Sequence, residues 1–182
     1  MGRGGVSLFS SRRIAAPSYV PMNMTKVFWS LPSSTAVPAL IGSAFLDAFP
    51  RDVEVRTEEL SNLPSAHFTV DDIWNLSRRV AALVADDAVD GVVVTHGTDT
   101  LEESAYLCDI SINTRKPIVF TGAMRTASEL GYDGLANIAS AIRVAADENA
   151  RDCGTLVVFN DEIHAARVVT KTNTTALETF LS

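Results

Sequence analysis

The chain has 182 residues, enough for one domain with a sizeable core. Its hydrophobic share of 47% and charged share of 20% are those of a globular protein. A balance of 15 basic against 22 acidic residues gives a net charge of −7, which argues against a nucleic-acid partner. No apolar run approaches the ~20 residues that span a bilayer, and the apolar stretch near the N-terminus is too short for a signal peptide. We therefore expect a cytoplasmic protein with no nucleic-acid or membrane partner.

The first 36 residues differ from the rest of the chain, because they mix Pro, Ser and Met without a sustained period. Such a stretch is a long loop, a disordered arm or a segment that has lost its pattern. We treat residues 1–36 as an atypical N-terminal segment and expect one α/β domain over residues 37–182.

From residue 53 onward, short apolar runs alternate with longer amphipathic ones. Apolar and polar residues alternate at 53–60, which predicts a half-exposed strand, and the helix after it begins at Thr69 with Asp72 in the position of a capping box. The remaining predicted elements are apolar strands at 91–95, 117–121 and 154–160, helices at 100–111 and 133–147, and a further helix beginning within 172–182. Strands that are apolar on both faces and separated by helices are typical of a covered parallel sheet. The predicted fold class is α/β, a parallel-rich sheet with helices on both faces (three-layer α/β/α), Rossmann-like or flavodoxin-like.

Three successive apolar strands end in polar residues, in "VVVTHGTDT", "VFTGAMR" and "VVFNDE". The carboxyl ends of parallel strands share one edge of the sheet, where such folds bind ligands. Gly97 and Gly122 permit tight turns there, and Thr100 begins the next helix. A purely structural role is the alternative, because Thr100 and Glu103 have the spacing of a capping box. The coincidence of three polar strand ends favours a site without naming a reaction.

His96 lies in the first of these strand ends. A relay of Thr98, His96 and Asp99 is conceivable, but three residues within one turn are poorly placed for it, so a structural histidine is favoured. His67 and His164 have no metal-ligand spacing with other residues, which argues against a zinc site. Cysteines 108 and 153 are expected to be buried free thiols.

Lys171 follows the third apolar strand, among apolar and hydroxyl residues in "VVTKTNTT". A desolvated ammonium group releases its proton more readily, so Lys171 is a candidate general base if it is buried. A neighbouring Asp99 would act in the opposite direction. An exposed lysine beside a helix start is the alternative.

Several blocks of the sequence occur in the order and spacing of a known family. "VVVTHGTDTLEESAYL", "PIVFTGAMR", "DGLANI" and "VVFNDEIHAARVVTKTNTTALETF" resemble the bacterial-type L-asparaginases. With "VPALIGSAFLDAFP" and "LPSAHFT", the resemblance covers residues 37–182, which correspond to the larger N-terminal domain of that family.

The resemblance implies an amidohydrolase that converts L-asparagine into aspartate and ammonia, with minor glutaminase activity and no metal or organic cofactor. Thr98 and Lys171 would activate the attacking group or water. Asp99 would hold both the lysine and the α-ammonium group of the substrate. These groups suit amide cleavage, which needs a nucleophile, a proton relay and donors for the oxyanion.

The resemblance also implies a binding site for L-asparagine and a homo-oligomer, either a dimer or a tetramer. Ser65 would bind the α-carboxylate, while Gly97 and Ala123 would line the pocket through their backbones. The substrate-binding residues implied are therefore Ser65, Gly97, Thr98, Asp99 and Ala123.

The chain departs from the family pattern in two places. The family begins with a strand followed by Thr-Gly-Gly-Thr-Ile-Ala, whose second threonine is the usual nucleophile. This chain has "SSRRIA" at residues 10–15 instead. Arg13 takes the position of that threonine, and Arg12 takes the position of a glycine. Ser10 or Ser11 could offer a hydroxyl there only if the loop were rebuilt. The chain also ends before the family's smaller C-terminal domain, which we expect to be absent.

These departures leave three interpretations open. One is a working L-asparaginase in which Thr98 is the nucleophile or activates water. Another is a catalytically impaired chain that binds amino acids or serves as an interaction module. Within the enzyme class, the alternative is a glutamine-preferring amidase or a tRNA-linked amidotransferase subunit.

Overall fold

The computed structural model describes the backbone of residues 6–10, 25–28 and 53–182, and the side chains of residues 53–182. The strands are β1 Val6–Ser10, β2 Thr25–Phe28, β3 Val53–Ser61, β4 Gly91–Thr95, β5 Ile118–Thr121, β6 Thr155–Phe159, β7 Glu162–Ala165, β8 Thr170–Lys171 and β9 Phe180–Leu181. The helices are η1 Ser65–His67, α3 Val70–Val84, α4 Leu101–Ser111, α5 Gly134–Ala146 and η2 Glu148–Ala150. None of the described helices is long and apolar enough to cross a membrane.

Seven of the described strands form one mixed sheet in the order β1-β3-β2-β4-β5-β6-β7, with additional pairings of β1 to β2 and β4. The central strands β2, β4, β5 and β6 run parallel, and β3 is parallel to β2. The strands β1 and β7 are antiparallel to their neighbours. In β4, β5 and β6 every apolar residue is buried, as expected for strands covered on both faces.

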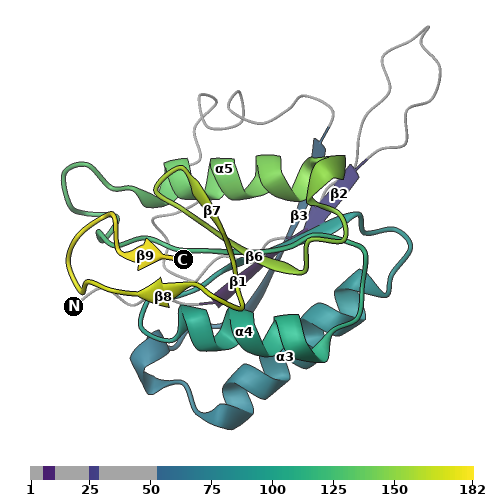
Figure 1. Cartoon of the computed structure of the whole chain (residues 1–182), viewed down its shortest axis with the longest axis horizontal. Helices are drawn as coiled ribbons and strands as arrows, with labels where there is room; N and C mark the ends of the chain where they lie inside the picture. The colour runs from purple at the N-terminus through teal and green to yellow at the C-terminus, as the bar shows by residue number, and fades with distance from the viewer. Residues whose placement is uncertain (1–5, 11–24, 29–52) are drawn as a thin grey trace, which may run out of the picture.

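Helices cover both faces of this sheet. Val92 and Val94 of β4 pack in one cluster with residues of α3 and α4, while Val93 packs in a second cluster with residues of α5. Successive residues of a strand point to opposite faces, so an unbroken valine run feeds both clusters. In Figure 1, α5 lies on one side of the sheet and α3 and α4 lie on the other. The predicted three-layer α/β/α fold is confirmed.

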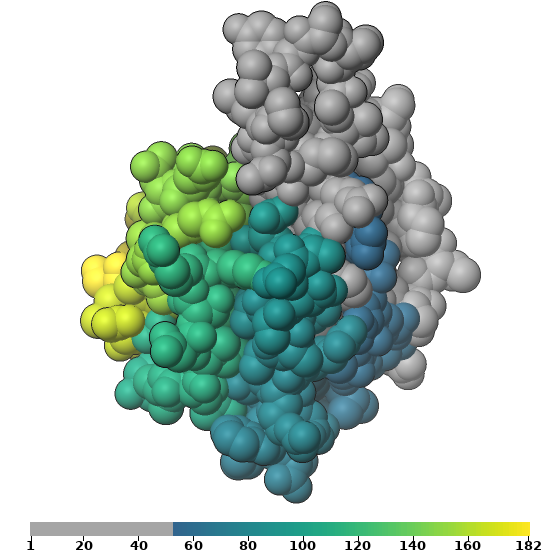
Figure 2. All heavy atoms as spheres, turned by 90° about the vertical axis from the view of Figure 1, so that its right-hand side faces the viewer, coloured from purple at the N-terminus to yellow at the C-terminus, as the bar shows by residue number. Residues whose placement is uncertain are grey.

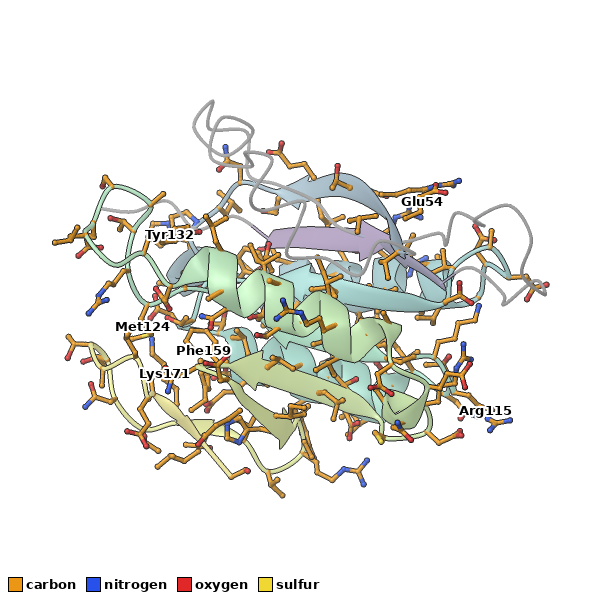
Figure 3. The ribbon with its side chains drawn as sticks, turned by 90° about the horizontal axis from the view of Figure 1, so that it is seen from above. Glu54, Arg115, Met124, Tyr132, Phe159 and Lys171 are labelled. Carbon is orange, nitrogen blue, oxygen red and sulfur yellow. The ribbon has the colours of Figure 1, made fainter. Side chains whose placement is uncertain are left out.

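The two ends of the parallel strands lie at opposite edges of the molecule. Figure 3 shows Met124, Phe159 and Lys171 together at one edge, which is the carboxyl edge, and Arg115 at the other. At the amino edge, Arg115 forms an ion pair with Asp152 at 2.8 Å. Across the face shown in Figure 2, the surface colours pass from blue through teal and green to yellow, in the order of the residues along the chain.

The structure bears on two expectations about the ends of the chain. Val6–Ser10 and Thr25–Phe28 are strands of the sheet, although the first 36 residues lack a sustained pattern. No helix begins within residues 172–182, which instead form a turn and the strand β9, whose Phe180 lies opposite Lys171 of β8. The domain boundary after residue 36 stays a prediction.

Candidate active site

The turn between β4 and α4 is built around His96, which is 2% exposed. Its backbone N–H donates to Thr121 of β5 at 2.8 Å, its Nδ1 lies 2.7 Å from the Gly97 carbonyl oxygen and its Nε2 lies 2.9 Å from Ser104 Oγ. Burial lowers the pKa of His96 to about 4, against the opposing effect of the Gly97 carbonyl. The ring is therefore neutral at pH 7, with the hydrogen on Nδ1 and Nε2 accepting from Ser104. The structural role predicted for His96 is confirmed, and the relay through it is wrong.

Ser65 lies more than thirty positions before this turn in the sequence, and its side chain and backbone are hydrogen-bonded to the turn. Its Oγ accepts a hydrogen bond from the Asp99 backbone N–H at 3.2 Å, and its carbonyl oxygen accepts from Thr100 Oγ1 at 3.0 Å. A Cβ atom on Gly97 would lie 2.4 Å from Ser65 Oγ, so only glycine allows this approach. The Ser65 hydroxyl accepts here and can still donate its hydrogen to a ligand carboxylate.

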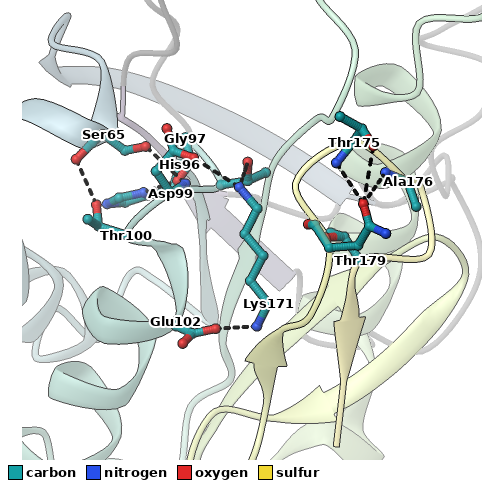
Figure 4. A network of polar contacts seen from close by, with 12 residues as sticks. Ser65, His96, Gly97, Asp99, Thr100, Glu102, Lys171, Thr175, Ala176 and Thr179 are labelled. Atoms are coloured by element: carbon teal, nitrogen blue, oxygen red, sulfur yellow. Dashed lines mark hydrogen bonds and ion pairs between the residues drawn. The ribbon is translucent and has the colours of Figure 1, made fainter.

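Lys171 reaches the same turn from β8, across the carboxyl edge of the sheet (Figure 4). Its Nζ lies 2.9 Å from Thr98 Oγ1 and 2.9 Å from Asp99 Oδ1. The Lys171 side chain is 14% exposed, whereas that of Asp99 is 59% exposed. The structure thus brings together Thr98, Asp99 and Lys171, as predicted, and leaves the carboxylate open to solvent.

The loop after β5 lies against Thr98. A Cβ atom on Gly122 would contact Thr98 Cγ2 at 3.5 Å and would come within 2.4 Å of the His96 carbonyl oxygen. Gly122 therefore serves a close approach of two strand ends. Ala123 is the next residue and is half-buried.

The loop after β5 is hydrogen-bonded to two residues that the sequence did not predict for the site. They are Asp133, at the N-terminus of α5, and Asn137, within α5. The Asp133 carboxylate accepts from the backbone N–H groups of Met124 and Arg125, each at 3.0 Å. The buried Asn137 side chain donates to the Gly122 carbonyl oxygen at 3.0 Å and accepts from the backbone N–H of Asn160 at 3.1 Å. Both residues lie in the "DGLANI" block, one of those that resemble the L-asparaginases.

Glu102, in the first turn of α4, was also missed. Its carboxylate accepts a short hydrogen bond from the backbone N–H of Lys171. An acidic residue near a helix N-terminus is common, so its type alone gave no signal.

Several smaller predictions need correction. Thr100 is the N-cap of α4 but makes no side-chain capping bond, because its hydroxyl donates to Ser65 instead, so the predicted capping box with Glu103 is wrong. Both cysteines are free, but only Cys108 is buried and Cys153 is exposed.

Other predictions concern metals and the N-terminal segment. Within residues 53–182, no group of three or more His, Cys, Asp or Glu side chains could hold a metal ion. Ser10 ends β1, and its side chain is outside the described residues, as are Ser11, Arg12, Arg13 and the block at residues 37–50.

The fold and this edge define an α/β protein with a hydroxyl, an amine and a carboxylate grouped at the carboxyl end of a parallel sheet. The family model "Asparaginase, N-terminal" matches residues 30–182, and the chain belongs to this family.

Three relatives show the extent of the similarity. The chain is 43% identical over 142 residues to L-asparaginase 2 of Bacillus subtilis, covering 76% of this chain and 38% of the relative. It is 42% identical over 128 residues to the glutaminase-asparaginase of Pseudomonas aeruginosa, covering 70% and 35%. It is 38% identical over 133 residues to an L-asparaginase of Bacillus licheniformis, covering 73% and 41%. The chain thus spans about two fifths of the length of these relatives.

Proposed function

We propose that this chain hydrolyses the side-chain amide of L-asparagine to L-aspartate and ammonia, with minor activity on L-glutamine. The observation that carries the proposal is the position of Lys171 Nζ, which lies 2.9 Å from both Thr98 Oγ1 and Asp99 Oδ1. Amide cleavage needs a nucleophile and a group that moves its proton, and this contact supplies both. Membership of the asparaginase family and the names of the relatives support the choice of substrate.

In the proposed reaction, Thr98 Oγ1 adds to the side-chain carbonyl carbon and its proton passes to the amine of Lys171. Lys171 delivers that proton to the departing nitrogen as the carbon–nitrogen bond breaks, which releases ammonia. Water then cleaves the acyl ester, releasing aspartate and restoring the Thr98 hydroxyl. One water is consumed and one ammonia is released. Helix α4 begins three residues after Thr98. The partial positive charge at the N-terminus of the helix favours the negative charge that develops on the amide oxygen.

Asp99 and Ser65 are the proposed contacts of the amino-acid end of the substrate. The half-exposed Asp99 carboxylate would pair with the α-ammonium group, and the Ser65 hydroxyl would donate to the α-carboxylate. Asp99 belongs to the turn that carries Thr98, and Ser65 is hydrogen-bonded to the backbone of that turn. A substrate held by both residues would therefore be fixed relative to the attacking oxygen.

The proposal extends to the state of the protein in the cell. We propose a cytoplasmic homo-oligomer, a dimer or a tetramer, that needs no metal or organic cofactor. The two free thiols fit a reducing compartment. Large apolar side chains exposed on α3 and α4 offer surface for subunit contacts, namely Val70, Trp74, Tyr106 and Ile110.

The test is ammonia release from L-asparagine, then from L-glutamine, by the purified 182-residue chain and by Lys171→Met. We expect Lys171→Met to lower kcat at least about a hundredfold, because general acid–base groups contribute about 10²–10⁴-fold. Lys116→Met is the matched control, since Lys116 bonds to Asp86 at the opposite edge of the sheet, and it should keep parental activity. Equal activity in parent and Lys171→Met would refute the proposal. A folded, inactive parent that aspartate stabilises against heat would favour an amino-acid-binding role instead.

A further inference from the structure

Lys171 is held at both ends by one short segment of the chain. Its Nζ lies 2.9 Å from both Thr98 Oγ1 and Asp99 Oδ1, and its backbone N–H donates to the carboxylate of Glu102. Figure 4 shows the Lys171 side chain extended between these two contacts. The segment Thr98–Glu102 therefore fixes both the root and the tip of the lysine.

The strand that carries Lys171 is short and lies outside the main sheet. β8 has two residues and pairs only with the two residues of β9 among the described strands. Short two-stranded ribbons are marginally stable without further packing. β9 is anchored by Phe180, which is 2% exposed. The centroids of the Phe180 and Phe159 rings are 5.0 Å apart. At its other end, β8 follows the buried Val169, and Lys171 lies two residues beyond that anchor, so a bond to its own backbone fixes its position further.

The register of the ribbon directs the Lys171 N–H away from β9. Thr172 N–H donates to the Thr179 carbonyl oxygen at 2.7 Å, so these two residues form a hydrogen-bonded pair. Bonded and non-bonded pairs alternate along an antiparallel ladder, which makes Lys171 and Phe180 a non-bonded pair. The Lys171 N–H thus cannot be satisfied by β9, and Glu102 is the group that accepts from it.

We propose that Glu102 is a positioning residue, which sets the reach of Lys171 to Thr98 by accepting from the lysine's backbone N–H. This inference rests on the proposed function, because it assigns the bond a consequence for proton transfer between Thr98 and Lys171. Glu103, the next residue of the same helix turn, is exposed and carries the same charge. The two glutamates therefore separate the effect of the hydrogen bond from that of negative charge near the helix N-terminus.

The experiment compares Glu102→Ala, Glu102→Gln and Glu103→Ala with the parent 182-residue chain. The glutamine amide oxygen accepts from an N–H as the carboxylate does, whereas alanine has no acceptor. For each protein, kcat and KM for ammonia release from L-asparagine are measured. The reactivity of the Lys171 amine toward trace acetic anhydride is measured by mass spectrometry, with Lys116 as the internal reference.

We expect Glu102→Ala to lower kcat at least about tenfold with KM within about threefold, since small misplacements of a reacting group cost about one to two orders of magnitude. Acetylation of Lys171 relative to Lys116 should rise at least about threefold, because Nζ is no longer held against Thr98 and Asp99. Glu102→Gln and Glu103→Ala should stay within about threefold of the parent in both measurements. If Glu102→Ala does not fold, Glu102→Met, which keeps the side-chain volume, takes its place.

The outcomes separate this inference from the proposed function. An inactive parent in which Glu102→Ala alone accelerates acetylation of Lys171 would refute the enzyme and retain the positioning role. Parental kcat and parental acetylation in Glu102→Ala would overturn the positioning role while leaving the enzyme intact. Equal losses in Glu103→Ala, or a Glu102→Gln variant as impaired as Glu102→Ala, would also overturn it, because charge would then be the cause.

Discussion

Lowering the pH from about 7.5 to about 5 should destabilise the folded chain through His96. The ring is buried beside Phe68 and Phe120, with centroid distances of 5.1 Å and 6.2 Å. Burial lowers the pKa of His96 from 6.5 to about 4 in the folded chain. The unfolded chain therefore binds more protons than the folded chain between these two values. The neutral ring's contribution to stability is complete above pH 6.5 and is lost as the pH falls toward 4.

The size of the effect follows from the two pKa values of His96. At about pH 5, the unfolded ring is almost fully protonated and the folded ring is about one tenth protonated. The difference in proton-binding free energy is then about 2 kcal/mol, which is a large fraction of the stability of a small domain. Carboxyl groups also titrate in this range, so the contribution of His96 must be taken as a difference against a variant that lacks it.

Urea unfolding at the two pH values provides the measurement, with His96→Gln as the reference. Glutamine does not titrate, and its amide can donate to Gly97 as the imidazole does. The variant will have a lower stability at both pH values, but the loss on acidification should be smaller by about 2 kcal/mol than in the parent. A parent and variant whose losses agree within about 0.5 kcal/mol would refute the assignment of a buried neutral ring.

Two further substitutions test the construction of the site and of the first long helix. Gly97→Ala places a Cβ atom 2.4 Å from Ser65 Oγ and 2.8 Å from Ser65 Cβ, so the turn must shift, and ammonia release should fall at least about tenfold. Unchanged activity would show that Ser65 can move aside freely. Thr69 is the N-cap of α3, and its Oγ1 accepts a hydrogen bond from the Asp72 N–H. Thr69→Ala removes this bond and should lower the free energy of unfolding by about 1 kcal/mol in urea titrations. Arg78→Ala, at an exposed residue of the same helix, is the control, and an equal effect in both would exclude the cap as the cause.

The sheet and its polar edge could be predicted because they depend on local patterns. A strand that is buried on both faces must be apolar at every position, and "GVVVT" and "TLVVF" are. The residues after such strands leave the sheet at one edge, so Thr98 and Asp99 could be placed beside the ends of β5 and β6. The capping box of Thr69 is similarly a matter of residues three apart in the sequence.

The contact of Lys171 with Thr98 could not be predicted in this way, because 73 positions separate the two residues. Their association depends on the path of β8, a two-residue strand with no period of its own. Only the resemblance to a known family pointed to the pair. The strands at Val6–Ser10 and Thr25–Phe28 were missed for a related reason, since strands of five and four residues are too short for a periodic signal.

The departures from local rules are concentrated at the proposed site. Thr69, which begins a helix that supplies no residue to the site, caps that helix with its own hydroxyl. Thr100 and Asp133 are the N-caps of α4 and α5, yet neither makes a side-chain capping bond. Thr100 donates to Ser65, and Asp133 accepts from two backbone N–H groups of the loop after β5. A capping bond stabilises a helix by about 1 kcal/mol, so both helices forgo that stabilisation in order to fix neighbouring loops. Those loops carry Ser65 and Ala123, the positions where an amino-acid substrate would have to be held against Thr98, and local rules are expected to give way where a site must be built.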